Sequence, residues 1–237
     1  MERREFTAQV CRVAVVAGSA GVWGFGAISI ARAADISQGD AALGIRAALE
    51  RGAVAAVGLL GRSGGFLDNP KVRIPLPGFL NDAAKLLQFT GQQERADELV
   101  TAMNRAAEAA VPQAKALLVS AVKAMSVADA RQIIAGSETS VTEFFAGRTR
   151  VPLAERFLPI VTRATEKVAL ADKYTAIAGK VARLGLIGKD DANIQLYVTG
   201  KALDGLYLMI GEEERKIRRD PVATGSAILS KVFGSLR

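Results

Sequence analysis

One edge of the segment from Gln93 to Val111 carries an amide, a guanidinium and a carboxylate in close sequence: Asn104, Arg105 and Glu108. Asn104 and Glu108 are four residues apart, so a helix places them on the same face. Such a cluster could hold a small anion or substrate, and Glu108 could act as an acid or base. The structural alternative is an ion pair between helices or a solvated helix face.

A second polar ridge is formed by Tyr197, Lys201 and Asp204. Asp204 lies between Leu203 and Leu206, so we expect its carboxylate to be partly buried and paired with a cation. Either cluster could supply the other's partner. We therefore predict that the two helices carrying them pack together, bridged by an ion pair from Arg105 to Asp204 or from Glu108 to Lys201.

Much other chemistry is excluded by composition. The 237 residues contain no histidine, one cysteine and one tryptophan. A Ser-His-Asp or Cys-His nucleophile system cannot be assembled without histidine, and the commonest zinc and di-iron sites are removed with it. We therefore assign no catalytic residue, no metal ligand and no cofactor.

The segment 61–77 is rich in glycine and proline and predicts a long loop. Five large apolar side chains lie in or beside it: Phe66, Leu67, Ile74, Leu76 and Phe79. They either fold back as a lid on the rest of the protein or contact a partner or lipid.

Apolar residues recur at spacings of three and four from Ala41 onward, and no stretch shows the sustained alternation of a strand. This pattern predicts an all-α, single-domain bundle of about eight or nine helices. The expected helices are 40–60, 78 or 81–90, 93–111, a helix from 112, 126–135, 140–146, 152–184, 190–219 and a last one after 221. We expect Asp40 and Asp190 to cap their helices, and capping boxes at Ser126 with Asp129 and at Ser140 with Glu143. The buried stripe of the helix 93–111 is expected to be mostly alanine. The helix 190–219 has apolar residues on two sides, so we expect it to be central, with Gly200 and Gly205 allowing close packing.

The N-terminus has the order of a secretory signal: Arg3, Arg4 and Arg12 precede an uncharged stretch that ends at Ala31-Arg32-Ala33. We predict a signal peptide over 1–33, a mature domain over 34–237 and a periplasmic location. An uncleaved membrane anchor is the alternative. The run from Arg3 to Phe6 resembles the twin-arginine signal, and the general secretory route is the other option.

Net charge gives little support for a nucleic-acid partner. The formal charge is +7 for the whole chain, and removal of four arginines and two glutamates with residues 1–33 leaves +5, spread along the sequence. Membrane contact of the mature chain is not favoured, because no helix carries a strongly one-sided basic face.

Several runs together resemble a bacterial family of exported proteins, numbered 4197 among the domains of unknown function. They are residues 64–70, 74–77, 103–112, 199, 201–206, 212–214, 216–218 and 231–234. The resemblance spans about Asp40 to Gly234. It implies an exported helical domain and brings no known activity, substrate or catalytic residue.

Two functions remain open. The first is a non-enzymatic periplasmic module that binds an envelope partner or a small ligand through the loop 61–79 and the edge containing Asn104, Arg105 and Glu108. The second is a carboxylate-dependent enzyme in which Glu108 or Asp204 acts as acid or base. The enzyme gains support if the two carboxylates face a common cleft without a neutralising cation.

Export predicts a defined N-terminus. Intact-mass measurement of the protein recovered from the periplasm should show a chain beginning at Ala34, because the small residues before it fit the pockets of signal peptidase. A chain that still begins at Met1 would contradict the prediction.

Overall fold

The computed structural model describes residues 38–78, 93–166, 174 and 193–220, and residues 36–237 form one compact unit. The described ranges contain helices and loops but no strand, which confirms the all-α, single-domain prediction. They hold six α-helices and one 3-10 turn, rather than eight or nine helices. These are α1 (Gln38–Leu60), α3 (Gln93–Ala110), η1 (Val111–Gln113), α4 (Ala114–Lys123), α5 (Val127–Ala135), α6 (Ser140–Thr165) and α8 (Ile194–Arg219).

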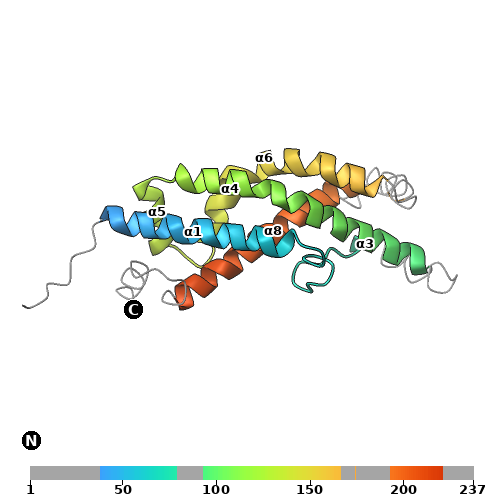
Figure 1. Ribbon diagram of the computed structural model, residues 1–237, viewed down its shortest axis with the longest axis horizontal. Helices are drawn as coiled ribbons and strands as arrows, with labels where there is room; N and C mark the ends of the chain where they lie inside the picture. The colour runs from blue at the N-terminus through green and yellow to red at the C-terminus, as the bar shows by residue number, and fades with distance from the viewer. Residues whose placement is uncertain (1–37, 79–92, 167–173, 175–192, 221–237) are drawn as a thin grey trace, which may run out of the picture. The chain divides into compact units, whose positions relative to one another are not determined.

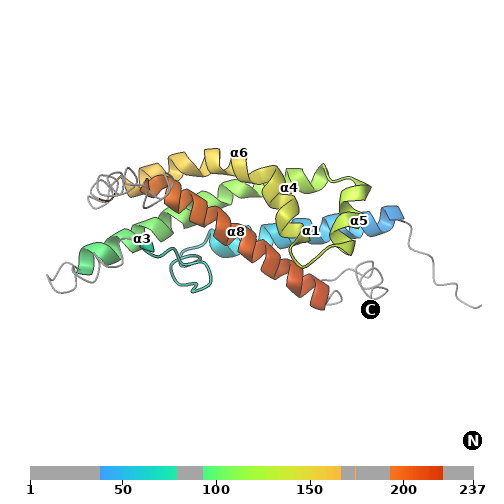
Figure 2. The same ribbon diagram turned by 180° about the vertical axis from the view of Figure 1, so that it is seen from behind.

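The helices expected over 78 or 81–90 and after 221 fall wholly or largely outside the described residues, and so does the part of the expected helix 152–184 that lies beyond residue 166, except for Tyr174. The helix expected over 190–219 lies within them from residue 193, where it is α8. It packs against α1, α3 and α6, as a central helix should. Figure 1 shows α8 crossing obliquely behind α1 and α3, and Figure 2 shows the same crossing from the opposite side, with α8 in front. Its apolar residues on two sides are therefore explained by neighbours on more than one side.

Local capping fixes some helix ends as expected and moves others. The Ser126 hydroxyl accepts a hydrogen bond from Asp129 N at 3.0 Å, while the Asp129 carboxylate accepts one from Ser126 N at 2.9 Å, which confirms the capping box of α5. By contrast, α8 is capped by Asn193 rather than by Asp190. The helix α1 begins at Gln38, so Asp40 lies inside its first turn.

Residues 140–165 form one helix, where two had been expected. The residue before this helix is Thr139, whose hydroxyl donates to the Glu143 carboxylate, so the predicted capping box at Ser140 is wrong. The helix continues through Pro152 and Pro159. A proline inside a helix costs about 3 kcal/mol or more, and burial of the apolar stripe on both sides of the two prolines offsets that cost. The fully buried members of the stripe are Phe145, Leu153, Phe157 and Val161.

The loop 61–77 contributes side chains to the core of this unit. Phe66 and Ile74 are almost completely buried. Gly64 has φ = +80°, a left-handed conformation that favours glycine. The Phe66 ring packs against α8 at Gly205, where a Cβ atom would lie 2.8 Å from Cε1 of the ring. The expected close approach therefore occurs at Gly205, but not at Gly200, where a Cβ would meet nothing within 4 Å.

This difference between the two glycines gives a matched test. Gly205→Ala should unfold more easily than Gly200→Ala by about 1–3 kcal/mol, because only the first overpacks the buried Phe66 ring. Both substitutions gain the same helix propensity, which cancels in the comparison. Chemical denaturation of the two variants measures the difference. Equal stabilities would contradict the packing described here.

Candidate functional site

The first sequence cluster fastens the loop 61–77 to α3. One oxygen of Glu108 accepts hydrogen bonds from the backbone N–H groups of Phe66 and Leu67, both at 3.1 Å. Arg105 donates to the other oxygen at 2.7 Å and to the Ser63 hydroxyl at 2.8 Å. The carboxylate is 4% exposed, so these contacts satisfy a buried charge.

Asn104 holds the later part of the loop in the same way. Its side-chain oxygen accepts from Ile74 N at 2.8 Å, and its nitrogen donates to Ile74 O at 2.9 Å and to Val100 O at 2.8 Å. The residue is fully buried. An irregular segment has no neighbouring strand or helical turn to pair with, and this amide takes the place of one for Ile74.

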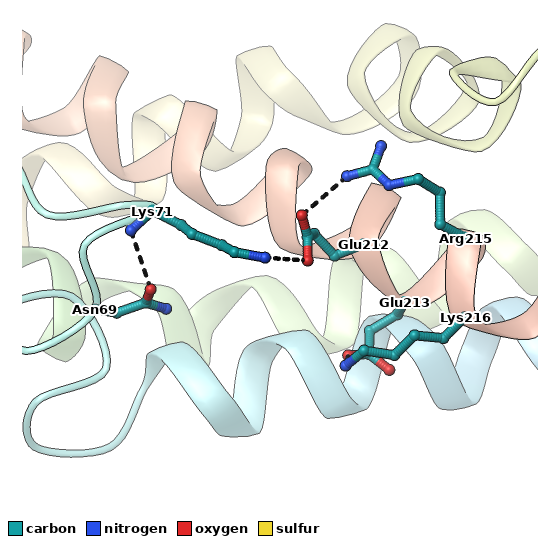
Figure 3. Close-up of polar contacts among 6 residues, drawn as sticks. All are labelled: Asn69, Lys71, Glu212, Glu213, Arg215 and Lys216. Atoms are coloured by element: carbon teal, nitrogen blue, oxygen red, sulfur yellow. Dashed lines mark hydrogen bonds and ion pairs between the residues drawn. The ribbon is translucent and has the colours of Figure 1, made fainter.

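The helix α8 fastens the loop from another side. The Tyr197 hydroxyl donates to Pro75 O at 3.1 Å. Lys71 pairs with Glu212 at 2.6 Å, and Arg215 holds the same carboxylate at 3.1 Å (Figure 3). Asn69 accepts from Lys71 N at 3.2 Å. Glu212 of α8 thus contacts the exposed Lys71 in the middle of the loop, while Tyr197 contacts Pro75 near the end of the loop.

These contacts place the apolar loop residues against the bundle. Phe66 and Ile74 are buried, and Leu67 and Leu76 are half-buried. Phe79 lies outside the described residues. Of the two interpretations of this loop, folding back as a lid is the one that the contacts support.

Burial of the Glu108 carboxyl would by itself raise its pKa. Hydrogen bonds from Leu67 N, Arg105 and Phe66 N together outweigh that effect and lower the pKa below its ordinary value. Glu108 is therefore held as a carboxylate, which suits a group that fastens two backbone donors and is the wrong direction for a general acid near neutral pH.

The predicted bridge between the two clusters is wrong, although α3 and α8 do contact one another. Arg105 pairs with Glu108 on its own helix, and Asp204 pairs with Arg150 of α6 at 2.7 Å. Asp204 is also half-exposed rather than buried, with a side-chain exposure of 52%. The two carboxylates do not share the groove that Asp204 lines.

A groove between α6 and α8 is the surface where the rest of the second cluster lies. It is lined by Arg150, Val151, Ala154, Glu155, Leu196, Tyr197, Thr199, Gly200, Lys201, Leu203 and Asp204. Two of its apolar side chains face solvent, Val151 at 71% exposure and Leu196 at 38%. We call this surface the α6–α8 groove.

Both signs of charge border the α6–α8 groove. The Arg150 guanidinium pairs with Asp204 and lies 5.9 Å from the centre of the Tyr207 ring. The Lys201 ammonium lies 5.8 Å from the centre of the Tyr197 ring, within the range of a cation–π contact. Thr199 is 3% exposed, and its hydroxyl has no hydrogen-bond partner among the described residues.

Sequence reasoning missed Arg150, Val151, Glu155 and Leu196. The signal was present at Val151, which falls outside the buried stripe of α6 and is therefore an apolar residue on a polar face. This signal was missed because one helix was expected to end at residue 146 and the next to begin at residue 152, so Val151 was not assigned to a helix face.

In the described ranges, no helix is long and apolar enough to cross a membrane. The same residues contain no group of three or more His, Cys, Asp or Glu side chains that could hold a metal ion.

The fold and contacts define an all-helical protein built around a docked loop. The family model described as "Protein of unknown function (DUF4197)" matches residues 35–234, and the chain belongs to this family. No curated protein and no solved structure matches it.

Fastening of the loop predicts unequal effects at the two carboxylates. Glu108→Ala should lower the free energy of unfolding by about 2–4 kcal/mol, because it leaves two backbone donors at the loop without an acceptor. Asp204→Ala should cost about 0–1 kcal/mol, because its ion pair is exposed. Urea denaturation measures both, and a neutral Glu108→Ala would refute the structural role.

The pH dependence gives a control for this prediction. The folded-state pKa of Glu108 is lowered, so its stabilisation is present above about pH 4.3, the ordinary pKa of Glu, and is lost as pH falls below it. The stability difference between wild type and Glu108→Gln should shrink over that acid range. Comparison at each pH cancels Glu214, whose pKa is raised by burial.

Proposed function

We propose that this protein is an exported, non-enzymatic module of the bacterial cell envelope that binds a helix of an envelope protein in the α6–α8 groove. The observation that carries the proposal is a pair of solvent-exposed apolar side chains that line this groove, Val151 and Leu196. An exposed apolar surface bordered by polar residues is typical of an interaction site.

The arrangement of side chains supports a protein partner. The α6–α8 groove is lined by apolar residues together with charged residues of both signs, a combination that is also found in protein interfaces. Ala154 and Gly200 leave room between the larger side chains, since a Cβ at Gly200 would meet nothing within 4 Å. A groove with spaced apolar anchors suits an amphipathic helix laid along it.

The unpartnered Thr199 hydroxyl supports the same conclusion. A buried polar group without a hydrogen bond costs about 1–3 kcal/mol. Thr199 lines the α6–α8 groove, so a polar group of the bound helix could satisfy it. Its companions Tyr197, Lys201 and Asp204 supply further hydrogen-bonding groups along α8.

The enzymatic alternative has less support. Glu108 is neutralised by Arg105 and occupied by two backbone donors, and Asp204 is paired with Arg150. Both carboxylates are therefore paired with a cation, which removes the support that two unneutralised carboxylates in a common cleft would have given to an enzyme. We therefore assign these two residues no catalytic role.

The proposed location rests on the sequence. The basic residues, the uncharged stretch and Ala31-Arg32-Ala33 are the parts of a secretory signal, and residues 1–33 are proposed to be that signal. The route is the twin-arginine or the general secretory pathway. The partner is then a protein exposed to the periplasm.

Site-specific photo-crosslinking tests the binding proposal. A photoreactive phenylalanine at Val151 or at Leu196 should form an adduct with one protein, and the crosslinked peptide should come from a helix of that protein. The matched controls are Leu208 on α8 and Leu43 on α1, which are also exposed, at 41% and 58%, but lie outside the groove. These positions should give no such adduct.

A groove-filling variant provides the second control. Gly200→Phe places a ring in open space, so it should fold but abolish the adducts at both groove positions. Equal adducts at Leu208, no adduct at either groove position, or an adduct with the mass of a small molecule would contradict the proposal.

A further inference from the structure

A second groove, on the other side of α6, has only one sign of charge. It is lined by Pro112, Gln113, Lys115, Ala116, Val119, Ser120, Lys123 and Arg156, from η1, α4 and α6. We call it the α4 groove. Its charged residues are three cations, and none of its lining residues is acidic. This is unlike the α6–α8 groove, where cations and carboxylates alternate.

The three cations of the α4 groove are also unpaired. Seven ion pairs neutralise cations elsewhere in the described parts of the chain, but none involves Lys115, Lys123 or Arg156. All three are exposed. Glu155, the neighbour of Arg156 in the sequence, lines the α6–α8 groove instead. The cations therefore repel one another without local compensation, and an anion would relieve that repulsion.

The remaining polar groups of the α4 groove are the amide of Gln113 and the hydroxyl of Ser120. Both can donate hydrogen bonds, as the three cations do. Phosphate groups offer several acceptor oxygens and a negative charge, so they complement a surface of donors. Lys115 and Lys123 are eight residues apart, which is about 12 Å along α4. That spacing suits several phosphates side by side better than a single one.

The surface between the cations is apolar and open, with Pro112 and Ala116 exposed and Val119 half-buried. Sites for single-stranded nucleic acid interleave cations with aromatic rings on which bases stack, and no aromatic side chain lines this groove. A lipid surface needs no such rings. Cations that contact headgroups beside small apolar residues that contact the acyl boundary are typical of a peripheral membrane site.

From this combination we infer that the α4 groove binds the headgroup phosphates of an anionic phospholipid membrane. Sequence analysis did not favour membrane contact because no single helix was basic on one side. In the structure the basic residues come from two helices, because Arg156 of α6 lies in one groove with the two lysines of α4.

Vesicle co-sedimentation of the full chain tests the inference. The protein is mixed either with vesicles of equal parts phosphatidylglycerol and phosphatidylcholine or with vesicles of phosphatidylcholine alone. The quantity measured is the partition coefficient for the first vesicles divided by that for the second. The apolar N-terminal stretch is the same in every variant, so it does not affect the comparison between them. Replacing Lys115, Lys123 and Arg156 together by Gln should reduce the ratio roughly 100-fold, at about fivefold for each charge.

The matched control replaces Arg62, Arg73 and Arg131 by Gln. These are also exposed and form no ion pair with the described residues, but they lie outside the α4 groove, so the net charge changes equally. This control should keep most of the wild-type ratio. Circular dichroism melts should show that both triple variants are folded. If the variant lacking Lys115, Lys123 and Arg156 is destabilised, Lys123→Gln alone replaces it in the test, with an expected fivefold decrease of the ratio.

Four results would overturn the inference: an equal loss in the control triple variant, no preference of the wild type for anionic vesicles, displacement of the protein from vesicles by inorganic phosphate alone, or equally strong retention by double-stranded DNA. The first would indicate non-specific charge attraction. The third would indicate a soluble phosphate ligand, and the fourth a nucleic-acid site.

Discussion

The irregular backbone of the loop 61–77 has to be buried without leaving its polar groups unpaired, and the rest of the described structure depends on how that is achieved. A buried N–H or C=O without a partner costs about 1–3 kcal/mol, and a loop has no regular ladder to supply one. Glu108 and Asn104 of α3 provide acceptors and a donor for Phe66, Leu67 and Ile74. The glycine at position 205 of α8 leaves space for the Phe66 ring of the loop.

This arrangement explains the runs on which the family resemblance rests. The glycine-rich segment at 64–70, the segment at 103–112 and the segment at 201–206 are distant in sequence, yet they meet at one junction between loop, α3 and α8. Asn104 and Glu108 serve the fold at that junction, whereas Lys201 and Asp204 of the third segment line the α6–α8 groove. Surfaces that could serve a partner lie elsewhere, along the two grooves that border α6.

The two grooves differ in charge, and this difference is the basis for the two different partners proposed for them. Mixed charge with exposed Val151 and Leu196 suits the polar and apolar faces of a protein helix, whereas uncompensated positive charge suits phosphate. Because α6 contributes to both, a protein seated on anionic lipid through the α4 groove would still present the α6–α8 groove to a partner. Placement of a binding surface at a membrane is a role that needs no catalytic group.

Periodicity alone determined the all-α class, most of the buried stripe of α3 and the central position of α8, because burial of one helix face is a local, repeating pattern. The capping box at Ser126 and Asp129 was equally local. Only the tertiary structure decided that α6 continues through two prolines, because packing before and after them offsets an energetic penalty that the local sequence cannot offset.

The tertiary structure also decided which residues the charged side chains pair with. From the sequence, Asn104 and Glu108 could have bound a small ligand, formed an ion pair between helices or faced solvent, whereas in the structure they bond the loop that lies 30 to 42 residues earlier in the sequence. Asp204 pairs with Arg150 rather than with Arg105. Side-chain partners across such separations depend on how helices are placed in space, and one sequence does not contain that information in any local form.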